Sequence, residues 1–228
     1  TWTKGWSNCE FDNNIIHDGN KLISVSYSAG ASNVTVSNNT IDNSAVGITI
    51  GSAGVGGTVD GVIISGNTIH RGLLWSGQAD IHTNHIHTFA AHASSSITGL
   101  QIYENKYYGD CGTNVTVQAY VEANGGTIVA PKVYNNIFTF DASPSGSCAN
   151  GAMYFKGGWS DALVYGNTFS LGGQTGLTID SGSGMIIKNN IFNTSGTAIG
   201  PFSSTSSISE SDYNTFLSTS DFLWGSWS

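Results

Sequence analysis

The sequence predicts an all-β fold, a single-stranded parallel β-helix (a solenoid) of about eight turns with an asparagine ladder. First, one short phrase, an Asn followed two residues later by a large apolar residue, recurs eight times. Second, a β-branched or aromatic pair precedes most copies by two to four residues. Third, nearly half of the 228 residues are Gly, Ser, Asn or Thr and only 10% are charged, which suits short strands and turns better than long helices.

The eight copies of the phrase are spaced 23 to 38 residues apart along nearly the whole chain. That period is too long for a hairpin, and no helical pattern lies between the copies to make a βαβ unit. A solenoid in which each period is one winding fits both facts. The repeated asparagines are Asn14, Asn39, Asn67, Asn105, Asn136, Asn167, Asn190 and Asn214.

Each repeated asparagine has a predicted structural role. We expect the Asn to form a tight bend, because it tolerates left-handed backbone angles. Its side-chain amide would bond the equivalent Asn of the adjacent winding, about 4.8 Å away. The apolar residue two positions later would point inward and stack in a ladder. We therefore expect these asparagines to build the fold and to do no chemistry.

A second apolar strand is predicted roughly ten residues after each phrase, and the longer gaps would hold outer loops. These predicted strands cover residues 46–50, 86–89, 115–121, 152–155, 177–179 and 197–199.

Composition excludes several classes of protein. The net charge of −8 argues against sequence-independent nucleic-acid binding. The chain has no run of about twenty apolar residues, so no membrane span is predicted. A hydrophobic content of 39% with 25 aromatic residues can fill a core. We expect one domain over residues 1–228, as a fragment or trimmed form of a longer chain. The aromatic segment 221–227 could cap one end, and the uncapped N-terminal edge favours either a missing upstream segment or end-to-end self-association.

The pattern over residues 9–217 resembles the right-handed parallel β-helix repeats of the pectate-lyase-like superfamily. The resemblance rests on Val-Tyr-Asn-Asn-Ile-Phe at 133–138 and Ile-Ser-Gly-Asn-Thr-Ile at 64–69. It implies right-handed winding. The superfamily includes polysaccharide lyases, glycoside hydrolases, epimerases, phage tailspikes, adhesins and structural proteins, so the fold leaves the activity open.

Few lysines, many Ser, Thr and Asn, and three cysteines fit an exported protein, and we expect an extracellular or cell-surface location. Cys111 and Cys148 lie in predicted loops one turn apart and could form a disulfide, which leaves Cys9 over. Four glycosylation sequons occur, although chance produces several in such a chain. They start at Asn33, Asn38, Asn114 and Asn193.

The densest polar cluster spans residues 80–89. On a strand, His85, His87 and Phe89 would share the outer face, while Ile86 and Thr88 would face the core. Stacking of later windings then predicts two outer rows, although a one-residue slip would reverse the faces. One row is His87, Tyr120 and Tyr154, followed by Thr178. The other is Phe89, Glu122, Lys156 and Asp180.

These rows predict a face that binds a polysaccharide. Phe89, Tyr120 and Tyr154 would stack on sugar rings, and catalysis would fall to His85, His87, Glu122, Lys156 and Asp180. For β-elimination, Lys156 or a neutral His would be the base and a Tyr the proton donor. For hydrolysis, Glu122 and Asp180 would form a carboxylate pair two windings apart, roughly 9–10 Å, which suits inversion of configuration.

Other observations keep alternatives open. The only arginine, Arg71, precedes the cluster, and neither a run of acidic calcium ligands nor the paired-Asp motif of β-helical hydrolases occurs. No catalytic residue of the superfamily can therefore be carried over, and a cofactor is not specified; Ca²⁺ would belong to a lyase.

The same cluster allows a metal site made by His82, His85 and His87 with Asp80, if the chain bends at Thr83-Asn84. His17 and His70 are predicted as inert outward positions. The alternatives to an enzyme are a structural or adhesive solenoid (a filament or cell-surface subunit) and a non-catalytic sugar-binding domain.

Overall fold

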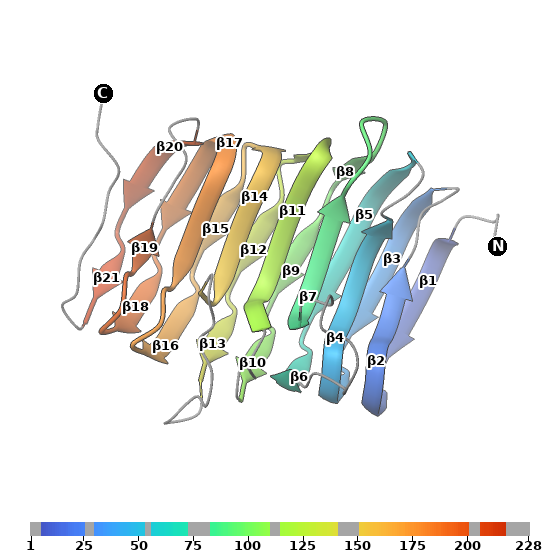
Figure 1. Ribbon diagram of the computed structural model, residues 1–228, viewed down its shortest axis with the longest axis horizontal. Helices are drawn as coiled ribbons and strands as arrows, with labels where there is room; N and C mark the ends of the chain where they lie inside the picture. The colour runs from blue at the N-terminus through green and yellow to red at the C-terminus, as the bar shows by residue number, and fades with distance from the viewer. Residues whose placement is uncertain are drawn as a thin grey trace.

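The computed structural model describes residues 6–25, 30–52, 56–72, 83–109, 115–140, 151–200 and 206–217. Every regular element in these ranges is a β-strand, and the strands form one large parallel sheet. Each strand pairs with strands about one repeat earlier and one repeat later in the sequence, as a β-helix-like solenoid requires. In Figure 1 the windings lie side by side, with β1 and β2 at one end and β20 and β21 at the other.

The strands fall into three sets. Those before the repeated Asn are β1 (Trp6–Asp12), β3 (Ala31–Ser37), β5 (Thr58–Ser65), β8 (Ser96–Thr98), β9 (Gln101–Tyr103), β12 (Lys132–Tyr134), β15 (Leu163–Tyr165) and β20 (Ser206–Asp212). Short strands after it are β6 (Thr68–Gly72), β10 (Lys106–Tyr108), β13 (Ile137–Thr139), β16 (Thr168–Gly172), β18 (Ile191–Thr194) and β21 (Thr215–Phe216). The third set follows the short strands in the chain and comprises β7 (Thr83–Ala90) and β19 (Ile199–Gly200).

Five long strands continue from one set into the next. They are β2 (Ile15–Val25), β4 (Thr40–Ser52), β11 (Val115–Val129), β14 (Met153–Ser160) and β17 (Leu177–Lys188). The front layer of Figure 1 contains β2, β4, β7, β11, β14 and β17, and this layer carries the predicted polar rows.

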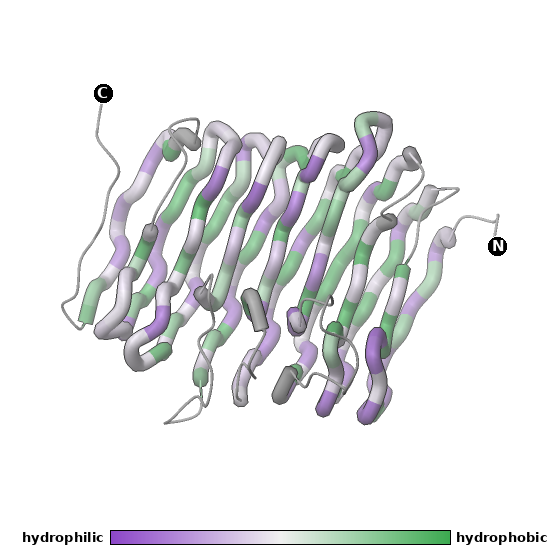
Figure 2. The backbone as a smooth tube through the Cα atoms, in the orientation of Figure 1, coloured by the Kyte–Doolittle hydropathy of each residue, from purple (hydrophilic) through white to green (hydrophobic). Residues whose placement is uncertain are grey.

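Side chains alternate between the core and the outer surface along most strands. In β12, for example, Val133 is buried whereas Lys132 is exposed. Figure 2 shows the resulting alternation of hydrophobic and hydrophilic positions along the strands. Because equivalent residues of successive windings pair in register, the inward positions form continuous apolar rows, and these rows make the core.

The asparagine ladder is present at all eight predicted positions. From Asn14 to Asn190, the backbone N–H and Nδ2 of each Asn both donate to Oδ1 of the Asn in the next winding, at 2.9–3.0 Å. The six ladder residues from Asn39 to Asn190 are buried. The bonds therefore satisfy polar groups that water cannot reach.

The predicted reason for the bend is wrong in one respect. The left-handed residue is the one before each ladder Asn, for example Asn38 (φ 54°), Gly66 (φ 64°) and Glu104 (φ 57°). The ladder asparagines themselves are not left-handed. The preceding residue makes the turn, and this leaves the Asn side chain directed inward along the stack, where its amide can bond both neighbours.

The apolar residue two positions after each ladder Asn from Asn14 to Asn190 points inward, as predicted, whereas Phe216 at the end of the row is 44% exposed. The row begins with Ile16, Ile41 and Ile69 and continues as stacked rings, starting with Tyr107 on Phe138 (centroids 4.6 Å apart, planes 8° apart). Phe169, Phe192 and Phe216 extend the stack. We call the rings from Tyr107 to Phe216 the inner ladder.

Some sequence predictions fall on residues outside the described ranges. The proposed disulfide between Cys111 and Cys148, the sequon at Asn114 and the aromatic tail are among them. Cys9 is described; it is a partly buried free thiol. The side chains of Asn33, Asn38 and Asn193 are exposed. Within the described ranges, no helix is long and apolar enough to cross a bilayer.

Candidate functional site

The two predicted outer rows have the predicted register. His87 pairs with Tyr120, which pairs with Tyr154, which pairs with Thr178. In the adjacent row Phe89 pairs with Glu122, and the row continues through Lys156 to Asp180. Strands β7, β11, β14 and β17 thus bring together residues that lie 24 to 35 positions apart in the sequence.

The rings of the first row stack on one another. His87 lies 4.8 Å from Tyr120 with the planes 11° apart, and Tyr120 lies 5.2 Å from Tyr154 with the planes 14° apart. We call these three residues the His87 ladder. Phe89 packs against His87 at 4.8 Å in a tilted arrangement. The predicted stacking of Tyr120 on a sugar ring therefore does not fit the structure, because both faces of the Tyr120 ring are already covered by other rings.

Glu122 is the hub of the second row. Nε2 of His87 lies 3.1 Å from Oε2 of Glu122, and Nζ of Lys156 lies 3.4 Å from Oε1. Tyr120 also forms a hydrogen bond with this carboxylate. The Glu122 side chain is only 15% exposed and that of His87 16%, whereas that of Lys156 is 42% exposed. One half-buried carboxylate therefore holds an imidazole, a phenol and an ammonium group.

The electrostatics of this hub fix two protonation states. Burial raises the pKa of Glu122, but the hydrogen bond from His87 and the charges of His87 and Lys156 outweigh it, so the net pKa is lowered. Burial and then the Glu122 charge raise the pKa of Tyr120 far above its ordinary value. At neutral pH, Glu122 is therefore ionised and Tyr120 protonated.

Asp180 ends the described part of the second row and is also tied in place. Its Oδ2 lies 3.5 Å from the Tyr154 hydroxyl, and its Oδ1 accepts a hydrogen bond from Ser181 Oγ at 3.0 Å. Trp159 Nε1 donates to the Asp180 backbone carbonyl at 3.2 Å. Burial and the nearby Asp180 charge raise the pKa of Tyr154 to about 12, so this hydroxyl is a proton donor at neutral pH.

The prediction that His85 shares the outer face with His87 is wrong. His85 is 1% exposed and stacks on Tyr107 of the inner ladder, with centroids 6.1 Å apart and planes 13° apart. Neither of its ring nitrogens has a hydrogen-bond partner within the described residues. Burial, with a smaller contribution from the charge of His70, lowers its pKa to about 3.

The cause is the corner at which β7 begins. Residues 83–86 are all buried, so the two-residue alternation fails there. Gly47 lies opposite His85, and a Cβ on Gly47 would meet side chains of Ile41 and Ile69 at 3.3 and 3.4 Å, so this position faces the inner row. The equivalent residues of later windings are Gln118, Ala152, Gly176 and Ala198.

Together with Gly47 and His85 these residues form a column of six, of which Gly47, Ala152, Gly176 and Ala198 are small. The small residues were the signal in the sequence that this column faces inward. Gln118 is the second polar member of the column, and it was missed. It is fully buried, and its Nε2 donates to the Thr139 carbonyl at 2.9 Å, while its Oε1 has no partner within the described residues. The column is therefore structural, and His85 is removed from the candidate site.

The metal-site alternative lacks support. His85 faces the core and His87 faces outward, so one ion cannot bind both imidazoles. Within the described ranges, no group of three or more His, Cys, Asp or Glu side chains could hold a metal ion. Asp80 and His82 lie outside those ranges.

His70 was predicted to be inert, but it has close partners. Its Nδ1 lies 2.9 Å from Oδ1 of Asp42, and its ring stacks on Tyr108 at 4.3 Å. Nζ of Lys106 lies 5.5 Å from the centre of the Tyr108 ring. Asp42 and Lys106 are well exposed, so this cluster is a solvated surface pair beside a stack rather than an enclosed site.

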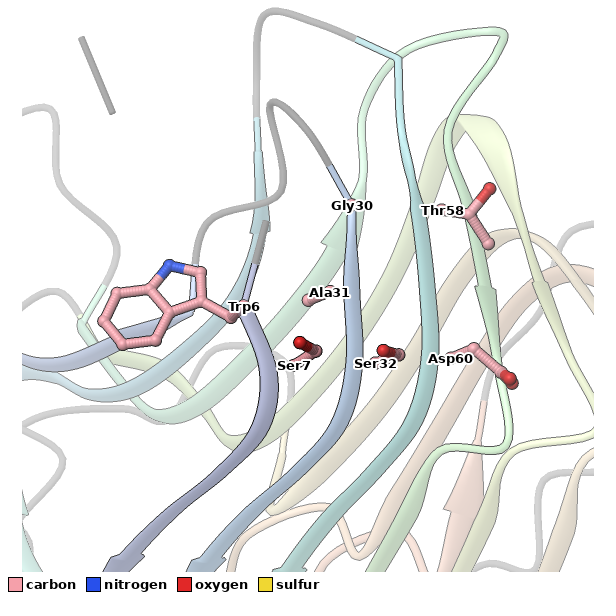
Figure 3. A pocket seen from close by; sticks show the side chains of 7 residues that line it. All are labelled: Trp6, Ser7, Gly30, Ala31, Ser32, Thr58 and Asp60. Carbon is pink, nitrogen blue, oxygen red and sulfur yellow. The ribbon is translucent and has the colours of Figure 1, made fainter. Parts of the chain in front are cut away.

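A hollow of about 360 Å³ lies away from both rows, at the start of β1, β3 and β5. It is lined by Trp6, Ser7, Gly30, Ala31, Ser32, Thr58 and Asp60. Figure 3 shows the Trp6 indole and the Asp60 carboxylate pointing in opposite directions, so the hollow does not focus polar groups on one point. Trp159 is 1% exposed and belongs to the core.

The candidate site is therefore the outer face of β7, β11, β14 and β17. It comprises His87, Phe89, Tyr120, Glu122, Tyr154, Lys156 and Asp180. We compared the chain with protein-family models, with curated proteins and with solved structures, and nothing matched in any of the three comparisons.

Proposed function

We propose that this outer face binds a polysaccharide and hydrolyses it. One observation supports the proposal above all others: the Glu122 carboxylate is half-buried and ionised, with His87 Nε2 at 3.1 Å and Lys156 Nζ at 3.4 Å. Surface ion pairs contribute little to stability and are usually solvated. A carboxylate with three polar partners from three successive windings is the kind of positioned group that catalysis requires.

In this proposal Glu122 is the general base. It would take a proton from water, the water oxygen would attack the anomeric carbon, and the glycosidic C–O bond would break. His87 and Lys156 orient the carboxylate. Asp180, two windings away and roughly 9–10 Å distant, is in its protonated form the acid that gives its proton to the leaving oxygen. This separation is that of inverting enzymes, in which a water molecule fits between the two carboxyl groups.

Hydrolysis agrees with the ionisation of the face better than β-elimination does. On this face, β-elimination would use an uncharged Lys156 or a neutral His as the base that removes the C5 proton of a uronate. Nζ of Lys156 lies 3.4 Å from Oε1 of Glu122, so this amine is already engaged by the carboxylate. The ring nitrogen of His87 that faces Glu122 is also engaged. Elimination, with Ca²⁺ as a cofactor, is thus the second chemistry to test.

Three finer features belong to the same proposal. The winding is right-handed with about eight turns, as the resemblance to the pectate-lyase-like superfamily implies. The protein acts outside the cell or at its surface, and the exposed sequon asparagines Asn33, Asn38 and Asn193 carry glycans there. Its partner is a polysaccharide.

The test is a screen of purified protein on neutral and uronate-containing polysaccharides, with and without Ca²⁺. Reducing ends report hydrolysis, and ultraviolet absorbance of unsaturated products reports elimination. Glu122→Gln keeps the shape of the side chain and should lower the rate of hydrolysis about 100-fold or more. Tyr134→Phe, on another outer surface, is the matched control and should leave the rate unchanged.

The outcomes separate the alternatives. Reducing ends that depend on Glu122 support the proposal, whereas unsaturated products would replace hydrolysis with elimination. Silence in both channels together with binding would leave a sugar-binding domain. Silence without binding would favour the structural or adhesive solenoid that associates end to end.

A further inference from the structure

A buried histidine lies at the start of β7, beneath the candidate site. His85 is fully buried, and neither of its ring nitrogens has a hydrogen-bond partner within the described residues. An imidazole that loses its water and gains no partner costs free energy on folding. His87, whose Nε2 lies 3.1 Å from Glu122, follows His85 by two residues on the same strand. The position of His85 therefore affects the strand that holds the site together.

None of the described residues that pack against His85 carries a negative charge. Gly47 of β4 and Gln118 of β11 flank it in the inward column. Tyr107 of β10 stacks on its ring, and burial keeps the Tyr107 hydroxyl protonated. From β6, His70 contributes a like charge that opposes protonation of His85. Because a buried charge without a counter-charge is very unfavourable, a protonated His85 is expelled from this place.

The first residues of β7 are held less regularly than the rest of the strand, which lies between β4 and β11 (Figure 1). The register between β11 and β7 shifts between Val115 and Val117, opposite the first two residues of β7. From Ile86 onward the register is regular, and the inward side chains of Ile86 and Ala90 are buried. Residues 83–85 can therefore open at a lower free-energy cost than the whole winding.

We propose that the start of β7 is an acid-sensitive switch: when His85 gains a proton, residues 83–85 turn out of the core while the other windings stay folded. The opening loosens the backbone that holds His87 against Glu122, and in this respect the inference rests on the proposed function and names a regulation of its site. A solvated histidine binds a proton more readily than a buried one, so opening becomes more favourable as the pH falls.

Hydrogen–deuterium exchange of the full chain, read by mass spectrometry and corrected for the intrinsic exchange rate at each pH, tests the switch. Between pH 6.5 and 4.5 the protection of the amides in residues 83–86 should fall about 50-fold, whereas peptides from β14 and β17 should keep theirs.

Two variants assign the effect. His85→Gln has no group that titrates in this range, so its β7 amides should lose the pH dependence. His92→Gln is the matched control, because His92 is an exposed histidine whose Nδ1 lies 2.8 Å from Ser94 Oγ, and it should behave like the native protein. Thermal melts establish that both variants are folded; if His85→Gln is not, the comparison of β7 with β14 in the native protein decides.

Three outcomes would overturn the switch: unchanged protection of β7 in acid, equal loss of protection in every winding, or the native pH dependence in His85→Gln. The exchange needs no catalysis, so a native protein that cleaves no polysaccharide refutes the proposed function and leaves the switch to be decided by exchange. If the protein does cleave, the rate of His85→Gln should fall less between pH 6.5 and 4.5 than the native rate. An equal fall would overturn the regulation.

Discussion

Two aromatic ladders run along the outer surface, and their rings are stacked in nearly the same way. In the His87 ladder the centroids are 4.8 and 5.2 Å apart. Tyr103, Tyr134 and Tyr165, which we call the Tyr134 ladder, are each 4.8 Å from the next. The ladders differ in the residues that lie two positions later in the chain. Those are Phe89, Glu122 and Lys156 in one case and the buried ladder asparagines in the other.

The comparison separates stacking from chemistry. Stacking follows from in-register repetition of aromatic residues at the winding spacing, and it occurs wherever the sequence supplies them. Chemistry depends on the neighbouring row. The Tyr134 hydroxyl bonds a neutral amide, Oε1 of Gln101 at 3.2 Å, whereas Tyr120 bonds a carboxylate that also contacts His87 and Lys156. The first ladder is an ordinary solenoid surface and the second a candidate site.

Removing the central ring of each ladder gives the largest expected difference. Tyr120 is 5% exposed and bonded to Glu122, so Tyr120→Ala should lower the free energy of unfolding by about 3–5 kcal/mol. Tyr134 is half-exposed, and Tyr134→Ala should cost about 1–2 kcal/mol, since it loses less buried area. Urea denaturation of the two variants checks the order. Equal losses would contradict the difference between the ladders.

Acid should destabilise the core beneath the His87 ladder. In the unfolded chain His85 binds a proton below its ordinary pKa of 6.5, but in the folded protein only near pH 3. The unfolded state therefore gains a proton between these values, and stability falls as the pH drops, by about 3 kcal/mol at pH 4.5. The lowered pKa of Glu122 adds a further loss only below its ordinary value of 4.5.

The variant His85→Leu isolates this contribution. It has no group to protonate, and its apolar side chain replaces an imidazole that has no hydrogen-bond partner among the described residues. Thermal melts between pH 7 and 4.5 should therefore show a flatter pH dependence than in the native protein. A slope equal to that of the native protein would show that His85 is not the group responsible.

Removing the charge of Glu122 should lower stability by less than Tyr120→Ala does, and by less than the protonation of His85 in acid does. Glu122→Gln leaves Lys156 and His87 without their carboxylate, and we expect a loss of about 1–3 kcal/mol at pH 7 in urea denaturation. The expected loss shrinks at pH 4, because the native carboxylate is then closer to being protonated. A constant loss at both pH values would mean that the charge of Glu122 contributes nothing.

The smallest effect is expected at the end of the Tyr134 ladder, where Lys188 follows Tyr165 in register. Lys188 Nζ lies 2.7 Å from Oε1 of Glu210, a shorter distance than that between Lys156 and Glu122. Both partners are about a third or more exposed, however, so Lys188→Met should change stability by less than about 0.5 kcal/mol. A loss above that of Glu122→Gln would show that distance, and not burial, determines the contribution of these pairs.

Most of the row assignments could be predicted from the sequence because a solenoid converts sequence period into spatial order. Once the repeated asparagines fix the winding length, the pairing of His87 with Tyr120 and of Glu122 with Lys156 follows by counting. The pairing of Glu122 with His87 could not be counted, since it joins neighbouring rows and depends on rotamers. The carboxylate hub therefore needed the structure.

The amino-acid sequence by itself determined the parallel stacking, the asparagine ladder and the composition of the outer rows, because these depend on residue spacing alone. The tertiary structure decided that His85 turns inward and that the rings of the His87 ladder cover one another's faces. The strict two-residue alternation of side chains holds only where a strand is straight, and β7 begins at a corner. Ring faces are likewise covered by whichever ring lies one winding away, as Tyr120 is covered by His87 and by Tyr154.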